Sequence, residues 1–193
     1  RAIENLGTDF LFPEIKYKFH ACCHGLHSFL EALDEMKLEN NFNPETIEEI
    51  AIETNPSWLK VCNIEEPKTG LESKFSYKLT AAMSIYGKDT SNLDTYSDEI
   101  CFDDKLNNIR DKVRVIPNDN LSNTQSLISI KDGSSNVKNK HDLSDKIENN
   151  ILETKIVNKS VSLLSETKSN QISKILNAPN ENKVDALVDC LVS

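Results

Sequence analysis

Residues 17–36 read YKFHACCHGLHSFLEALDEM, and the stretch changes character at Gly25. Before the glycine, histidines and cysteines cluster. After it, apolar residues recur every three or four positions, as they do along one face of an amphipathic helix. The polar run ENNFN at residues 39–43 ends this pattern. The spacing predicts a helix over residues 24–39 whose apolar stripe consists of Leu26, Phe29, Leu30, Leu33 and Met36.

Strand-like and helix-like patterns alternate after this helix. Apolar residues alternate in residues 46–54 (TIEEIAIET) and 124–133 (TQSLISIKDG), which predicts half-buried strands. A chain that mixes both kinds of element in this way predicts an α+β fold. The other expected elements are an extended segment at 8–20, a helical turn or short strand at 57–63, helices at 71–87 and 103–113, a strand from 113 to Pro117, a short strand at 136–138, and helices at 146–165, 167–177 and 180–192.

Composition and net charge argue against some classes of binding partner. The 193 residues carry a net charge of −9, which argues against nucleic acid and anionic membranes, because both attract clustered Lys and Arg. No run approaches the roughly 18 apolar residues that cross a bilayer. The first ten residues lack the apolar core of a signal peptide. With five cysteines, an odd number, we expect reduced thiols and a cytoplasmic protein.

Two interpretations compete for HACCHGLH at residues 20–27. Histidine and cysteine bind zinc, so the stretch could belong to a stand-alone zinc-binding or protein-interaction module. Structural zinc sites, however, usually draw two ligands from each of two separated knuckles, and Cys62, Cys101 and Cys190 each stand alone. In the other interpretation, the small residues 21–23 pack a buried junction before the helix and the histidines flank it. No C-x-x-C spacing supports redox chemistry.

The order of several motifs closely resembles the C-terminal region of the MmgE/PrpD family, which includes 2-methylcitrate dehydratases and cis-aconitate decarboxylases. The family pattern FKxxxCxxGTH is similar to residues 17–27, where Leu26 replaces the usual threonine. Further similarities follow in the same order, and together they cover about residues 8–190. They are IEEIAIET (47–54), KFS (74–76) with its following helix, KVRV (112–115) and SLISIKDG (126–133).

The resemblance implies an α+β lid domain at residues 1–140 and a C-terminal helical segment at 141–193. In the family, these helices return to a large all-helical domain that supplies an acid–base Asp and His set. That domain is absent from this chain, which begins with Arg1, so we expect a piece of a longer protein that is inactive alone. The implied activity is that of a lyase on a small di- or tricarboxylate, with loss of water or carbon dioxide. It requires no metal or cofactor, and the full-length protein is expected to form a homodimer.

The resemblance assigns Lys18 a catalytic and substrate-binding role. A polycarboxylate needs cations to hold it, and a lysine on a lid can reach in as the site closes. The ammonium would stabilise the enolate-like charge that develops during elimination. His27, Lys74 and Ser76 fall at matching positions and are expected to bind substrate or line the pocket. In the alternative interpretation, Lys18 is a solvated lysine on a strand and His27 is simply a histidine on a helix face. Lys74 and Ser76 then lie away from the site.

Overall fold

The structure, a computed structural model, describes residues 7–8, 15–179 and 183–192. The elements in chain order are η2 (His24–Leu26), α1 (His27–Glu39), β1 (Ile47–Thr54), α2 (Pro56–Leu59), α3 (Gly70–Ser73), α4 (Tyr77–Ile85), η3 (Leu93–Thr95), η4 (Glu99–Phe102), α5 (Asp104–Arg110), β2 (Val113–Pro117), β3 (Gln125–Asp132), β4 (Ser135–Asp142), α6 (Asn149–Leu164), α7 (Glu166–Asn177) and α8 (Lys183–Val192). The predicted α+β class is confirmed. Of the predicted segment at 8–20, residues 9–14 lie outside the described residues, as do residues 180–182 of the last predicted helix.

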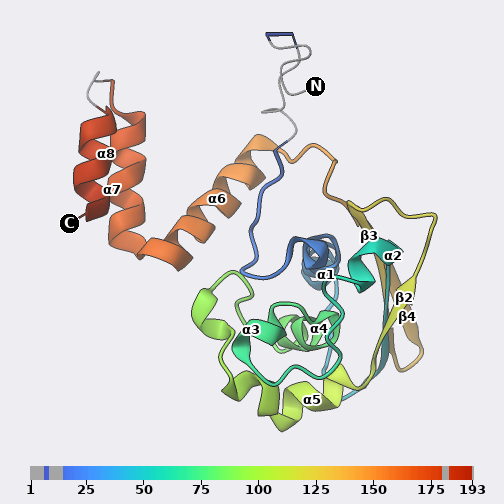
Figure 1. The fold of residues 1–193 in the computed structure, drawn as a ribbon. Helices are drawn as coiled ribbons and strands as arrows, with labels where there is room; N and C mark the ends of the chain where they lie inside the picture. Colours follow the sequence, from blue (N-terminus) through green and yellow to red (C-terminus); the bar gives the residue numbers. More distant parts are fainter. Residues whose placement is uncertain (1–6, 9–14, 180–182, 193) are drawn as a thin grey trace.

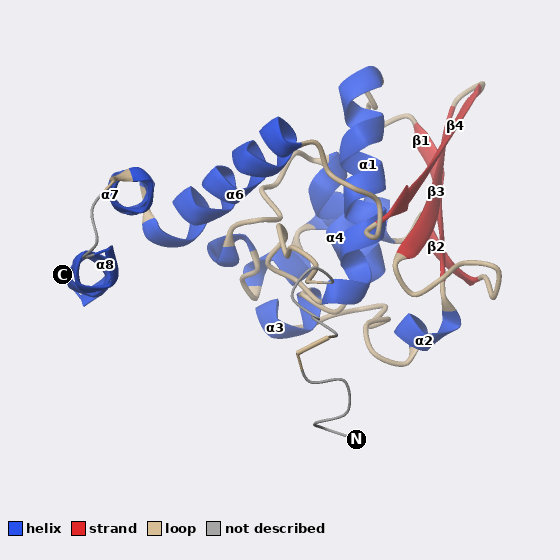
Figure 2. Cartoon of the chain, turned by 90° about the horizontal axis from the view of Figure 1, so that it is seen from above, coloured by secondary structure: helices blue, strands red, loops and turns tan. Residues whose placement is uncertain are grey.

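A four-stranded mixed sheet forms one layer of the body, in the order β2-β1-β3-β4. β1 pairs with β2 in parallel and with β3 antiparallel, and β3 pairs antiparallel with β4. The parallel pair requires a crossover, which residues 55–112 provide, including α4 and α5. Figure 2 shows the sheet seen along its edge, with α1 and α4 covering the same face.

The core lies between this face of the sheet and the helices. The five apolar residues of the predicted stripe are at most 3% exposed. The helix predicted at 24–39 is confirmed, with its first turn in the 3-10 geometry of η2. The sheet contributes four fully buried isoleucines to this core: Ile50 and Ile52 of β1, and Ile128 and Ile130 of β3. The alternation read from the sequence therefore points these side chains inward, as expected for a half-buried sheet.

The single helix predicted at 71–87 is wrong, because the structure breaks it into α3 and α4 at residues 74–76. Ser76 adopts an extended conformation and its side chain accepts a hydrogen bond from the Leu79 backbone N–H, which caps α4. The carbonyls of Lys74 and Phe75 accept hydrogen bonds from the backbone of Cys23 and Ile64. These carbonyls are thus used by other segments, whereas a continuous helix would have bonded them internally.

The polar stretch after Gly133 forms the edge strand β4, which is longer than the predicted 136–138. Gly133 has a positive φ of 58° and sits in the tight turn from β3. His141 pairs with Ser126 in the sheet, and its Nδ1 lies 2.8 Å from a Glu35 carboxylate oxygen. The alternation of this strand is weak because its outer edge faces solvent.

The C-terminal helices extend away from the body. Figures 1 and 2 both show α6 running outward from the sheet-and-helix layers, with α7 and α8 packed side by side beyond its end. These three helices lie close to the ranges predicted for them, although α8 is described only from Lys183. Among the helices that the structure describes, none is long and apolar enough to cross a membrane.

Candidate functional site

The junction at residues 20–27 is held between two loops that are distant in sequence. The backbone N–H of Ala21 donates to the carbonyl of Thr90 (2.8 Å), and that of Cys23 donates to the carbonyl of Lys74 (2.9 Å). The chain then turns into η2 when the Leu26 N–H bonds the Cys23 carbonyl. These bonds fix the backbone on which the predicted site residues sit.

Gly25 allows this junction to approach α2. A Cβ atom at this position would lie 2.5 Å from the Trp58 ring and 2.7 Å from the Cys62 sulfur, both far shorter than real contacts. The Gly25 carbonyl also accepts a 2.7 Å hydrogen bond from the buried hydroxyl of Tyr77. The close approach of the junction to Trp58 and Cys62 therefore leaves room only for a glycine at this position of the motif.

Three histidines come together at the junction. The His27 ring centroid is 5.2 Å from that of His20 and 5.4 Å from that of His24. His27 is 1% exposed, and its Nε2 has no hydrogen-bond partner among the described residues. Burial, together with the charges that His20 and His24 can carry, lowers the pKa of His27 to about 2. His27 is therefore neutral near pH 7, and it can exchange a hydrogen bond but is a very weak base.

Buried His20 and Glu31 extend this cluster. His20 Nδ1 lies 2.7 Å from the Thr90 hydroxyl, and His20 Nε2 lies 3.2 Å from a Glu31 carboxylate oxygen, although neither atom of that second contact completes a hydrogen bond. The other oxygen of Glu31 pairs with the Lys155 ammonium of α6. Burial opposes the charge of Glu31, but its contacts with His20 and Lys155 outweigh this and lower its pKa to about 2. Glu31 is thus a buried carboxylate at neutral pH.

Lys18 lies at the surface beside this cluster. It belongs to the irregular segment before the junction and is exposed, next to the stacked rings of Tyr17 and Phe19. Its charge is near enough to contribute, after burial, to the lowered pKa of His24. No carboxylate of the described residues forms an ion pair with Lys18. The lysine that the sequence singles out is accordingly an available cation.

Lys74 and Ser76 differ in their accessibility. Lys74 is half-buried, and its ammonium lies 5.6 Å from the centre of the Tyr96 ring, a cation–π contact. Ser76 is fully buried and its hydroxyl caps α4. The junction brings Lys74 close to Cys23 through their backbone bond, whereas the Ser76 side chain faces the core.

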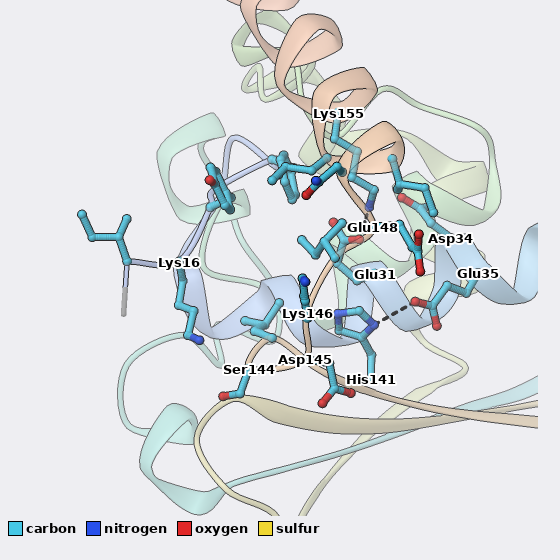
Figure 3. A pocket seen from close by; sticks show the side chains of 18 of the residues that line it. Lys16, Glu31, Asp34, Glu35, His141, Ser144, Asp145, Lys146, Glu148 and Lys155 are labelled. Atoms are coloured by element: carbon cyan, nitrogen blue, oxygen red, sulfur yellow. Dashed lines mark hydrogen bonds and ion pairs between the residues drawn. The ribbon is translucent and has the colours of Figure 1, made fainter. Parts of the chain in front are cut away.

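Two cavities adjoin the junction. The larger, about 900 Å³, lies between residues 15–19, α1, the loop after β4 and α6, and Figure 3 shows the mixed charges on its wall, including the ion pair of Glu35 with His141. Neither Lys18 nor His27, Lys74 or Ser76 lines it. The smaller, about 590 Å³, is walled in part by His20, Glu31, Thr90, Lys155 and Lys159. Of the three clustered histidines, only His20 lines the smaller cavity, and the predicted site residues Lys18, His27, Lys74 and Ser76 are not among its lining residues.

Cys22 and Cys62 are packing residues in this geometry. Cys22 is 3% exposed, and burial raises the pKa of its thiol to about 12. Cys62 is fully buried behind Gly25. Within the described parts of the chain, no three His, Cys, Asp or Glu side chains are placed to hold a metal ion. The zinc-binding alternative gains no support.

Sequence reasoning did not find Glu31 or Lys155. Glu31 follows Leu30 in the apolar part of α1 and lies one turn after His27, so a charged residue beside the helical stripe was the available signal. Lys155 lies 124 residues further along the chain, and no local pattern links it to Glu31.

Comparison with known proteins bears on nearly the whole described chain. No curated protein matches it significantly. The MmgE/PrpD C-terminal domain matches residues 20–178, which run from the histidine junction through the sheet and on through α6 and α7. The match covers His27, Lys74, Ser76 and the first two C-terminal helices, and Lys18 lies two residues before it begins. The chain therefore belongs to the MmgE/PrpD family, as a C-terminal domain of that family.

Proposed function

We propose that this chain is the lid part of a lyase that acts on a small di- or tricarboxylate, by proton abstraction with loss of water or carbon dioxide. Family membership supports the lyase class. The observation that carries the proposal is Lys18, an exposed cation without an ion-pair partner among the described residues, at the start of a rigidly held junction. Such a residue suits the capture of an anionic substrate.

Lys18 binds a substrate carboxylate in this proposal. Removal of a proton next to a carboxylate places enolate-like charge on that group, and an ammonium fixed beside it stabilises the transition state more than the ground state. The contribution grows when closure of the lid excludes water. Lys18 is in this sense the catalytic residue of the lid.

His27 and Lys74 have supporting roles in this proposal. The neutral His27 offers an imidazole nitrogen as a hydrogen-bond partner rather than as a base, consistent with its low pKa. Lys74 adds a second positive charge, held over Tyr96. Ser76 was also expected to contact substrate; its hydroxyl already caps α4, so the proposal does not depend on it.

The acid and base are proposed to come from a helical domain elsewhere in the full-length protein, against which the C-terminal helices pack. His27 is a very weak base, so another group must take the proton. The proposal requires no metal or cofactor, and it places the full-length protein in a homodimer without nucleic acid or membrane partners.

Turnover by the full-length protein tests this function. Double-bond formation or loss is followed by ultraviolet absorbance with 2-methylcitrate, citrate and cis-aconitate, for the wild type and Lys18→Met. We expect turnover of one substrate and a loss of at least about 100-fold in Lys18→Met, because a charge contact in a closed site is worth this much. Unchanged activity in Lys18→Met removes the proposed role of Lys18. Failure of all three substrates removes the lyase assignment for this substrate class.

A further inference from the structure

Lys155 on α6 contacts two other segments of the chain at once. Its ammonium pairs with the buried Glu31 carboxylate of α1. The same ammonium lies 5.1 Å from the centre of the Phe19 ring, which is a cation–π contact. Figure 3 shows the Lys155 side chain extending from α6 toward Glu31. One lysine therefore ties the segment that precedes the histidine junction to both α1 and α6.

The segment that carries Lys18 has few other anchors. Within residues 15–20, the described chain forms no hydrogen bond between backbone groups. The next two anchors both involve Thr90, which bonds the His20 ring through its hydroxyl and the Ala21 N–H through its carbonyl. Residues 15–18 are exposed, whereas Phe19 is half-buried. The Phe19 side chain is thus the contact nearest to Lys18 that holds the segment against the body.

The direction in which Lys18 points depends on Phe19. The rings of Tyr17 and Phe19 stack with their centroids 5.8 Å apart and their planes 8° apart. Side chains two residues apart lie on the same side of an extended backbone, and the residue between them points to the other side. Accordingly, Tyr17 and Phe19 both line the larger cavity, whereas Lys18 does not. Holding the Phe19 ring therefore fixes the side on which the Lys18 ammonium projects.

The contact among Phe19, Glu31 and Lys155 is partly shielded from water. All three residues line both cavities, so the contact lies where the two cavities meet. The Lys155 side chain is 31% exposed and that of Glu31 only 7%. Attraction between charges is stronger in such a place than on the open surface, because water screens it less. The contact is accordingly strong enough to hold an otherwise irregular segment.

We propose that Lys155 is a positioning residue for Lys18: it holds the Phe19 ring beside α1 and so sets where the Lys18 ammonium meets the substrate. The inference rests on the proposed function, because it assumes that Lys18 binds a substrate carboxylate. Lys155 itself touches no substrate in this account. The placement of Lys18 then depends on α6, the first helix of the C-terminal segment.

A double-mutant cycle on the full-length protein tests the inference, with the substrate that it turns over. Lys155→Met should lower kcat/KM about tenfold, because a displaced Lys18 ammonium loses the equivalent of one charged contact. In the Lys18→Met background, the same change should have less than about a twofold effect, since no ammonium remains to be positioned. A purely structural role of Lys155 would lower kcat/KM by the same factor in both backgrounds.

Three further variants make the result specific. Lys155→Arg keeps the positive charge, and its guanidinium can pair with Glu31 and stack on Phe19, so most of the activity should return. Phe19→Leu removes the ring but keeps the ion pair, and should lower kcat/KM about threefold, the effect of losing one cation–π contact. The matched control is Lys146→Met, which removes an exposed lysine from the wall of the larger cavity and should leave kcat/KM unchanged.

Limited proteolysis with endoproteinase Lys-C provides a readout that does not depend on turnover. The protease can cut after Lys18 only when the segment leaves the body, so the rate of this cut reports local opening. Mass spectrometry identifies the cut. We expect it to be about tenfold faster in Lys155→Met than in the wild type, and unchanged in Lys146→Met.

The outcomes separate the inference from the proposed function. Equal losses of activity in both backgrounds, or cleavage of Lys155→Met at the wild-type rate, would overturn the role of Lys155, while a large loss in Lys18→Met alone would leave the proposed function standing. Full activity in Lys18→Met would overturn both. If no substrate is turned over, the proposed function fails, and the cleavage rates still decide whether Lys155 holds the segment.

Discussion

The α/β body and the C-terminal helices bury their apolar residues to very different extents. Among the residues that the structure describes, every buried hydrophobic residue lies between Cys22 and Ile130, within the body. Along α6, α7 and α8, the described residues include no buried hydrophobic side chain. Large apolar residues there remain exposed, and they are Ile151, Ile156, Val157, Leu163, Leu164, Leu176, Val184, Val188, Leu191 and Val192.

The two regions are joined by polar contacts. Lys155 of α6 pairs with Glu31, and Lys159 and Ser162 both donate to the Ser91 carbonyl. Burial stabilises the body, whereas charge and hydrogen bonds place α6 beside the junction. The exposed apolar residues fit our proposal that another domain covers these helices.

The largest expected effect is loss of a core side chain from the body. Leu30 is fully buried on α1, so Leu30→Ala should lower the free energy of unfolding by about 3–5 kcal/mol through lost burial and a cavity. Denaturant unfolding followed by circular dichroism measures it. The control is Leu176→Ala on α7, a residue 52% exposed, which should cost less than about 1 kcal/mol. Equal losses would contradict the contrast between the regions.

Loss of the ion pair between Lys155 and Glu31 should have the next largest effect on stability. Lys155→Met leaves the Glu31 carboxylate buried without its cation and should lower stability by about 2–3 kcal/mol. The Lys155 side chain is partly exposed, which keeps the cost below that of a fully buried pair. Lys131→Met removes the surface pair with Glu48 and should change little. If both lysine variants unfold at the same denaturant concentration as the wild type, the ion pair of Lys155 with Glu31 does not stabilise the fold.

The pH dependence of stability should carry a contribution from His27. Its pKa falls from 6.5 to about 2 on folding, so the unfolded chain binds a proton below pH 6.5 that the folded protein does not. The stability that comes from keeping His27 neutral is fully present above pH 6.5, and it is lost progressively as the pH falls from 6.5 toward 2. Between pH 6 and 4.5 this amounts to at most about 1.4 kcal/mol per pH unit.

The His27→Gln variant isolates this contribution. Unfolding free energies at several pH values between 7 and 4.5 should show a shallower decline in the variant than in the wild type. Identical slopes would mean that His27 is not a buried neutral histidine.

The smallest effect is expected at the end of the chain. Leu191 is 57% exposed on α8, so Leu191→Ser should leave the unfolding of the body unchanged. Far-ultraviolet circular dichroism during thermal unfolding provides the measurement. A clear loss of stability would show that α8 packs on the body, and the contrast between the regions would need revision.

Much of the fold could be predicted because its periodicity is local. The stripe of α1 and the alternation in β1 and β3 come from residues that face one core. The break at Lys74 could not be predicted, because it depends on hydrogen bonds from Cys23 and Ile64. The length of β4 was underestimated because its sequence is mostly polar and shows little apolar alternation.

The candidate site was predictable only in part. Lys18 and His27 were proposed from a motif, and their roles stay predictions; the structure shows Lys18 exposed before the junction and His27 buried within it. Glu31, Lys155 and Lys159 were missed because tertiary structure alone brings α6 to α1 and Ser91. Electrostatic partners so distant in sequence leave no local pattern.

The most direct test of the central claim is a crystal structure of the full-length protein with tricarballylate bound. We predict a carboxylate of the ligand within hydrogen-bond distance of Lys18 Nζ, next to the histidine junction. A ligand bound elsewhere, for example in the larger cavity near Glu35 and His141, with Lys18 still in solvent, would contradict the account.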